Sequence, residues 1–213
     1  NTTMKTDFLK KGLGLLMVGV FCVIEAMAGT GETVKKNWKV GNFSSIEFNS
    51  VAQIFFVQSD KYSMTVEGKQ EEVVNLVAEV KGGCLYIDNK KRKSKISARN
   101  QKQGVKIYLS APTLEEVRFS GVGTFYCKEP MKLGDVNFQV EGVGSLEVKD
   151  LTCDDLTVSL SGVGSAELHV DCADLDASVE GIGSVTLSGK ADRAHVERSG
   201  IGSVNTKHLK VGL

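Results

Sequence analysis

Three aspartates stand at intervals of 20 and 19 residues in the second half of the chain: Asp135, Asp155 and Asp174, with Asp154 and Asp176 beside them. Stacked carboxylates could bind calcium, which prefers oxygen ligands, or act on a polysaccharide as general acid and base. Aspartate is also an ordinary turn residue, because its carboxylate caps nearby backbone amides. We expect turns here. Asp135, Asp155 and Asp174 are kept as calcium candidates, and no catalytic residue is assigned.

The histidines do not complete a catalytic set. His169, His195 and His208 share no position of the repeat described below and no carboxylate pattern, so we expect them on the surface. The sequence contains no nucleophile elbow, no H-E-x-x-H and no P-loop. We therefore expect a protein that is not an enzyme and that uses no cofactor.

Four cysteines follow the N-terminal leader: Cys84, Cys127, Cys153 and Cys172. Cys153 and Cys172 occupy the same repeat position, so parallel pairing would place their Cα atoms about 4.8 Å apart. That separation lies within the disulfide range of roughly 4.4 to 6.8 Å. The pair is either a disulfide or a stack of small buried thiols, and no C-x-x-C zinc pattern is present.

One short run is strongly basic: Lys90, Lys91, Arg92 and Lys93. A solvated loop between strands is its ordinary explanation, and a contact for anionic glycans or lipid headgroups is the alternative. The whole chain has 26 basic and 26 acidic residues, so its charge gives no reason to expect a nucleic-acid partner.

The element that must position these residues is a repeat. Gly-Val/Ile-Gly-Ser/Thr occurs five times, with first glycines 21, 20, 19 and 19 residues apart. The glycines of these elements are Gly121, Gly123, Gly142, Gly144, Gly162, Gly164, Gly181, Gly183, Gly200 and Gly202. Such a period indicates stacked units that bury their apolar faces against their neighbours.

Aligned on the glycines, the repeats form apolar columns two residues apart, which is the period of a strand. The columns are Glu115, Val136, Leu156, Leu175 and Ala194; Val117, Phe138, Val158, Ala177 and Val196; Phe119, Val140, Leu160, Val179 and Arg198; Phe125, Leu146, Ala166, Val185 and Val204; and Cys127, Val148, Leu168, Leu187 and Thr206. No repeat carries the apolar stripe of a helix. The sequence therefore predicts an all-β, right-handed parallel β-helix with rungs of 19 to 21 residues.

The Val or Ile between each pair of glycines could face either way: Val122, Val143, Val163, Ile182 and Ile201. If strand alternation continues through the glycines, these side chains form an exposed ridge; if a bulge shifts the phase, they enter the core. We favour the core, because large exposed apolar ridges are rare on soluble monomers.

Before the repeats, further strands are expected in a less regular part of the same coil, over 43–48, 51–57, 63–67, 84–88 and 105–110. Residues 71–78 could form one or two helical turns. Terminal rungs of a solenoid are atypical because they cap its ends. The coil is thus expected to be one domain over 38–213, preceded by a short segment over 29–37.

Residues 1–28 have the pattern of a secretory signal peptide. Lys5, Lys10 and Lys11 precede an apolar run over 12–24, and Ala26-Met27-Ala28 provides a cleavage site. Residues 1–3 precede the expected initiator, Met4. The apolar run is too short to span a membrane, so we expect no transmembrane segment in the mature chain.

From Trp38 to about residue 210, the sequence resembles the autotransporter-adhesin head domain called the GIN domain, found in exported envelope proteins of Gram-negative bacteria. The resemblance is carried by 40–46 (VGNFSSI), 64–68 (MTVEG), 80–87 (VKGGCLYI), 105–114 (VKIYLSAPTL) and the serial Ser-Gly-x-Gly turns. The family usually has Ser-Gly-Ser-Gly, whereas this chain has Val or Ile in the middle and Glu141 and Glu180 in place of the leading serine. The resemblance implies a β-helix and brings no catalytic residues.

The sequence thus predicts an exported, non-enzymatic, adhesin-like binding module whose ligand is a glycan or a protein. It would reside in the periplasm, on the outer membrane surface or outside the cell. Two alternatives stay open. One is a polysaccharide-active β-helix enzyme that uses Asp135, Asp155 and Asp174, and the other is a structural domain that self-associates through the ends of its coil.

Overall fold

The computed structural model describes residues 32–90 and 104–212. The predicted signal peptide lies outside the described residues, as do Lys91, Arg92 and Lys93 of the basic run. Lys90 is exposed, and its backbone amide donates to the Asn75 carbonyl at 2.7 Å. No helix among the described residues is long and apolar enough to cross a membrane.

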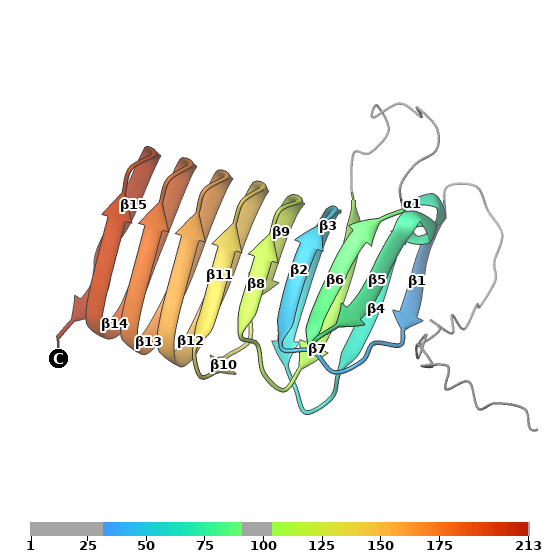
Figure 1. The fold of residues 1–213 in the computed structure, drawn as a ribbon, viewed down its shortest axis with the longest axis horizontal. Helices are drawn as coiled ribbons and strands as arrows, with labels where there is room; N and C mark the ends of the chain where they lie inside the picture. Colours follow the sequence, from blue (N-terminus) through green and yellow to red (C-terminus); the bar gives the residue numbers. More distant parts are fainter. Residues whose placement is uncertain (1–31, 91–103, 213) are drawn as a thin grey trace, which may run out of the picture.

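The second half of the chain winds into a flattened coil whose rungs stack side by side (Figure 1). Its strands are β8 (Glu116–Phe119), β9 (Val122–Cys127), β10 (Met131–Lys132), β11 (Val136–Val140), β12 (Val143–Leu160), β13 (Val163–Val179), β14 (Ile182–Arg198) and β15 (Ile201–Val211). Every pairing between these strands is parallel. The predicted β-solenoid is confirmed.

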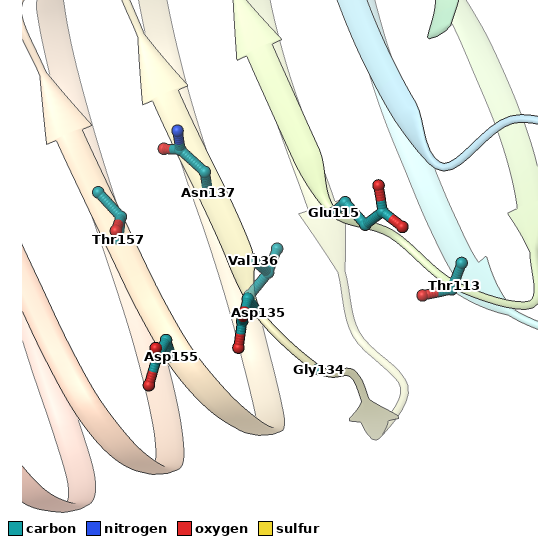
Figure 2. Close-up of a pocket in the computed structure, with 8 residues that line it drawn as sticks. All are labelled: Thr113, Glu115, Gly134, Asp135, Val136, Asn137, Asp155 and Thr157. Atoms are coloured by element: carbon teal, nitrogen blue, oxygen red, sulfur yellow. The ribbon is translucent and has the colours of Figure 1, made fainter. Parts of the chain in front are cut away.

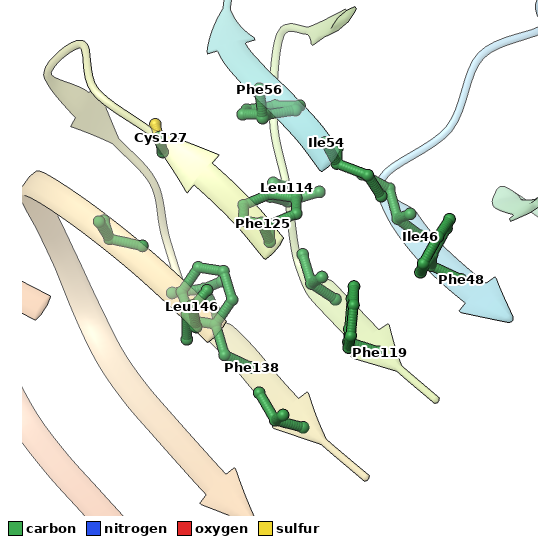
Figure 3. Close-up of a cluster of buried hydrophobic side chains, with 14 of the residues drawn as sticks. Ile46, Phe48, Ile54, Phe56, Leu114, Phe119, Phe125, Cys127, Phe138 and Leu146 are labelled. Carbon is green, nitrogen blue, oxygen red and sulfur yellow. The ribbon is translucent and has the colours of Figure 1, made fainter. Parts of the chain in front are cut away.

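The apolar columns also have the predicted register. Val136, Leu156, Leu175 and Ala194 follow one another from rung to rung, as do Val140, Leu160, Val179 and Arg198. The aligned side chains from Val117 to Val185 are buried. Figure 3 shows Phe125 of β9 and Phe138 of β11 in this core, and their ring centroids lie 6.2 Å apart. Among the described residues, Ser50 is the one polar residue in this core.

The first half of the chain supplies one regular rung and a cap. Its elements are β1 (Thr33–Trp38), β2 (Ser45–Asn49), β3 (Val51–Gln58), β4 (Ser63–Lys69), α1 (Gln70–Asn75), β5 (Leu76–Lys81), β6 (Cys84–Asn89) and β7 (Val105–Ala111). β2 and β3 pair in parallel with β8 and β9, whereas β1, β4 and β5 make antiparallel pairs that close this end. The sheet begins at Thr33, before the expected start at Trp38, because β1 pairs with β4.

An outward-facing aromatic ladder joins the cap to the coil. The rings of Tyr108, Phe55 and Tyr126 stack with centroids 5.2 and 5.0 Å apart. The ammonium groups of Lys35 and Lys128 lie over the two terminal rings, 5.3 and 5.1 Å from their centroids. Because other rings and the two ammonium groups cover the ring faces, the ladder stabilises the packing of the cap on the coil and offers no free ring face to a ligand.

The expectation that the Val or Ile of each Gly-x-Gly element enters the core is wrong. Strand alternation continues through the corner, so the glycines point inward and the Val or Ile points outward. The reason is space. A Cβ on Gly142 would lie 2.1 Å from the Gly121 carbonyl oxygen, and one on Gly144 would lie 2.0 Å from that of Gly123. At this edge of the coil, here called the glycine edge, the backbone of the neighbouring rung occupies the space that a Cβ would need, so only glycine fits.

Candidate functional site

The predicted aspartate column exists and lies on the outer face of the coil. Asp155 of β12 pairs in register with Asp174 of β13, which pairs with Arg193 of β14. Asp135 precedes β11 and extends the column by one rung, because its neighbour Val136 pairs with Leu156. The parallel register of the rungs therefore stacks these side chains as the alignment predicts.

The expected role of these aspartates as turn residues is met only by Asp135, which lies in the bend before β11. Asp155 and Asp174 lie within long strands. In the described part of the chain, no backbone amide donates to any of the three carboxylates. Their oxygens are thus not used as backbone caps, and Asp135 and Asp155 present theirs outward.

Figure 2 shows the open hollow that begins at this column. It has a volume of about 620 Å³ and is lined by Thr113, Glu115, Gly134, Asp135, Val136, Asn137, Asp155 and Thr157. A second hollow of about 410 Å³ continues along the same face and shares Asp155 and Thr157 with the first. Its other lining residues are Leu156, Asp174, Leu175, Asp176, Arg193, Ala194 and His195. Together they form a shallow polar groove across successive rungs.

The two hollows of the groove differ in charge. The Arg193 guanidinium donates to both carboxylate oxygens of Asp174, with Nε 2.6 Å from Oδ1. This contact raises the pKa of Arg193. Partial desolvation and the neighbouring carboxylates of Asp135 and Asp174 raise the pKa of Asp155, which Arg193 lowers only in part. The first hollow is therefore the electronegative end of the groove.

A second polar column runs beside the aspartates: Glu116, Asn137, Thr157, Asp176 and His195. Asn137 Oδ1 is shielded from solvent and accepts no hydrogen bond within the described residues. Amide, hydroxyl and carboxylate groups thus line the first hollow together. Asn137 and Thr157 were not among the residues predicted from the sequence, although the alignment that reveals the apolar columns also places them at one outward position.

The calcium candidates Asp135, Asp155 and Asp174 gain no support from the geometry. In residues 32–90 and 104–212, no three His, Cys, Asp or Glu side chains come close enough together to hold a metal ion. Calcium prefers six to eight oxygen ligands, whereas the aspartates are spread over consecutive rungs. The Asp174 carboxylate is also ion-paired with Arg193.

The sequence predicts that the histidines share no column, but His169 and His208 lie in one. The strand register shifts between Thr186 and Ser188, which places His208 opposite Ser188, the residue that also pairs with His169. His169 Nδ1 lies 3.0 Å from Ser188 Oγ. His195 also has carboxylate neighbours: its Nε2 lies 3.0 Å from Glu197 Oε1, and it pairs in register with Asp176. All three are exposed, as expected.

Cys153 and Cys172 are in register on adjacent rungs and are buried as free thiols. Their shared hydrogen bond and burial raise the pKa of Cys153. Burial also raises the pKa of Cys127 to about 12. Buried thiols with a raised pKa are poor nucleophiles, so Cys153 and Cys127 suit a packing role. The register that a Cys153–Cys172 disulfide needs is present, and the bond itself stays a prediction.

The comparisons with known proteins agree with the fold. The family model described as "Putative auto-transporter adhesin, head GIN domain" matches residues 42–212. A putative adhesin from Bacteroides fragilis NCTC 9343 is 21% identical over 82% of this chain and 96% of its own, with a TM-score of 0.67. A putative lipid binding protein from Parabacteroides distasonis ATCC 8503 is 24% identical over 86% and 77%, with a TM-score of 0.73. No curated protein matches the chain.

Proposed function

The chain belongs to the family of the putative auto-transporter adhesin head GIN domain, and we propose from this premise that it is an adhesin-like binding module without enzymatic activity. Family membership supports a place at the cell surface or envelope. The rigid stack of in-register strands suits such a role, because it holds outward side chains at fixed spacing over a long face.

The observation that supports a glycan ligand is the lining of the first hollow. Asp135, Asp155 and Glu115 offer carboxylate oxygens to sugar hydroxyl donors. Thr157 adds a hydroxyl, which can donate and accept, and Asn137 adds an amide N–H group, which can donate. Its volume of about 620 Å³ lies within the range of small-ligand sites, and the open groove beyond it could accommodate a chain of sugars.

A glycan array probed with the mature domain tests this proposal, with an array of host proteins beside it. The variant Asp135→Asn/Asp155→Asn should weaken glycan binding by about tenfold or more, because charge-assisted hydrogen bonds are lost. The matched control Asp60→Asn/Asp88→Asn changes two exposed aspartates elsewhere and should bind like the parent. Equal glycan affinity in the hollow variant would contradict the proposed site, and binding to proteins alone would favour the protein-ligand alternative.

A polysaccharide-active enzyme is the second candidate, and one observation favours it. The environment raises the pKa of Asp155, while its neighbour Asp174 is ion-paired with Arg193. Two carboxylates with such different surroundings can divide acid and base roles. A reducing-end assay on acidic and neutral polysaccharides decides between the candidates. Sugar release by the parent that is lost in Asp155→Asn would replace our proposal with this one.

We also propose that the chain is exported through cleavage of the signal peptide after Ala28. The mass of the mature protein recovered from the envelope fraction tests this step, because cleavage predicts Gly29 as the first residue. An intact N-terminus on the envelope form would contradict it.

A further inference from the structure

The glycine edge carries a straight line of exposed apolar side chains, here called the apolar ridge. Its members and exposed fractions are Val122 at 47%, Val143 at 53%, Val163 at 47%, Ile182 at 53% and Ile201 at 74%. Each pairs in register with the next, so the ridge repeats at the spacing of the rungs, about 4.8 Å. None of these side chains lines the polar groove.

Strand propensity alone does not explain the ridge. Threonine is β-branched like valine, favours strands and has nearly the same shape, yet none of the five positions has it. Five half-exposed Val and Ile side chains make a patch on the order of 400 Å², a size at which exposed apolar patches are often functional. The ridge has a cost in solubility that Thr would avoid, which points to a role in association.

We propose that the apolar ridge is a self-association surface that packs against the same ridge of a second copy of this chain. A second copy offers an apolar line with the same spacing, so two ridges can fit side by side over all five rungs, as in a steric zipper. With its flanking columns, the contact approaches the roughly 800 Å² per partner of a specific interface.

The flanking columns favour a second copy over an anionic lipid surface. The column before the ridge alternates in charge: Ser120, Glu141, Ser161, Glu180 and Ser199. The column after it carries hydroxyl groups throughout: Thr124, Ser145, Ser165, Ser184 and Ser203. Neither column has a basic residue, whereas attraction to anionic headgroups needs Lys or Arg.

The same columns specify the orientation of the two copies. A two-fold axis parallel to the coil places the hydroxyl column of one copy opposite the glutamate column of the other, so that Ser145 and Ser184 can donate to the partner's Glu141 and Glu180. Antiparallel ridges would instead bring Glu141 of one copy toward the partner's Glu180. Like charges repel, so the parallel arrangement is the one proposed.

Sedimentation of the mature domain at about 100 µM tests the association, with Val143→Thr/Val163→Thr/Ile182→Thr as the ridge variant. The parent should sediment as a dimer, and the ridge variant should dissociate with a dissociation constant at least about tenfold higher. Thr keeps the shape and strand propensity, and circular dichroism verifies the fold. Val57→Thr/Val74→Thr/Val77→Thr, which changes exposed valines away from the ridge, should remain dimeric. A monomeric parent or a dimeric ridge variant would overturn the proposal.

Oxidative cross-linking tests the orientation in a Cys84→Ser background. Val143→Cys alone should form disulfide dimers in the parallel arrangement, whereas antiparallel ridges would link Val143→Cys only to Ile182→Cys. Flotation with zwitterionic and with anionic vesicles separates self-association from lipid binding. Parent protein that floats with either vesicle, together with a ridge variant that does not, would overturn the second copy in favour of a lipid surface.

Discussion

At the scale of single residues, Asp155 shows that the stacking of similar rungs brings like charges close together. Parallel register places equal residues directly above one another, so a polar residue repeated in sequence becomes a line of like charges. Arg193 relieves this repulsion at Asp174, one rung away. Partial desolvation and the retained neighbours Asp135 and Asp174 together raise the pKa of Asp155.

The variant Asp155→Asn should therefore be more stable than the parent at neutral pH. The folded-state pKa of Asp155 is raised above its unfolded value, so its ionised form opposes folding. The penalty is present above the folded-state pKa and disappears as the pH falls below the ordinary value for aspartate. Melting temperatures between about pH 7 and pH 3 should show a gain that shrinks toward acid. Asp60→Asn, which changes an exposed aspartate away from the column, is the matched control. A destabilised Asp155→Asn would contradict the account.

Leu160 tests the phase of the core at the same scale. It is fully buried between Val140 and Val179, so Leu160→Asp would place a carboxylate without a partner in the apolar column. The loss should exceed about 3 kcal/mol of unfolding free energy. The neighbouring outward change Ser159→Asp should cost less than about 1 kcal/mol, because the carboxylate stays hydrated. Denaturant titration checks both, and similar losses for the two variants would mean that the phase is wrong.

The alignment predicts a site residue only where the same residue type recurs in one column. The aspartates recur, so the alignment finds Asp135, Asp155 and Asp174. Arg193 occupies their column without repeating their type, and its ion pair becomes evident only in the register of β13 and β14. The histidine column was missed for another reason: the irregular register between Thr186 and Ser188 breaks the constant spacing on which the alignment relies.

At the scale of elements, the glycine edge determines the shape of each rung. Apolar columns two residues apart were sufficient to predict the strands and the inward side chains. The orientation of these Val and Ile side chains was predicted wrongly because the prediction considered only that exposed apolar side chains are unfavourable. The deciding quantity is the room at the glycine positions, where the backbone of the adjacent rung excludes any Cβ.

Gly144→Ala tests this steric account. The added methyl group would lie 2.0 Å from the Gly123 carbonyl oxygen, and a backbone atom held by two rungs cannot move aside easily. The expected loss is more than about 3 kcal/mol of unfolding free energy. Gly134→Ala is the matched control, because a Cβ there meets nothing within 4 Å, and its stability should change by less than about 0.5 kcal/mol. Equal melting temperatures for Gly144→Ala and the parent would show that the edge can widen.

At the scale of the whole molecule, the two ends of the coil differ. Antiparallel strands and the aromatic ladder close the N-terminal end, where Lys35, Tyr108, Phe55, Tyr126 and Lys128 span four strands and the residue after β9. The last rung, β15, pairs only with β14 within the described residues. Its inward positions are less buried than those of the central rungs. Two inner columns end in polar residues, Arg198 at the end of β14 and Thr206 in β15.

The stability of the rungs should therefore decrease toward β15. In a solenoid each rung is held mainly by its neighbours, so a rung with one neighbour opens more readily than a rung with two. Native-state hydrogen exchange should show the fastest amide exchange in 201–211 and the slowest in the first half of β12, which is flanked by β9 and β13. Measuring the parent beside the monomeric ridge variant separates this gradient from any protection by a second copy. If all strands exchanged at one common rate in both proteins, the coil would unfold as a single cooperative unit, and its open end would not be its weakest part.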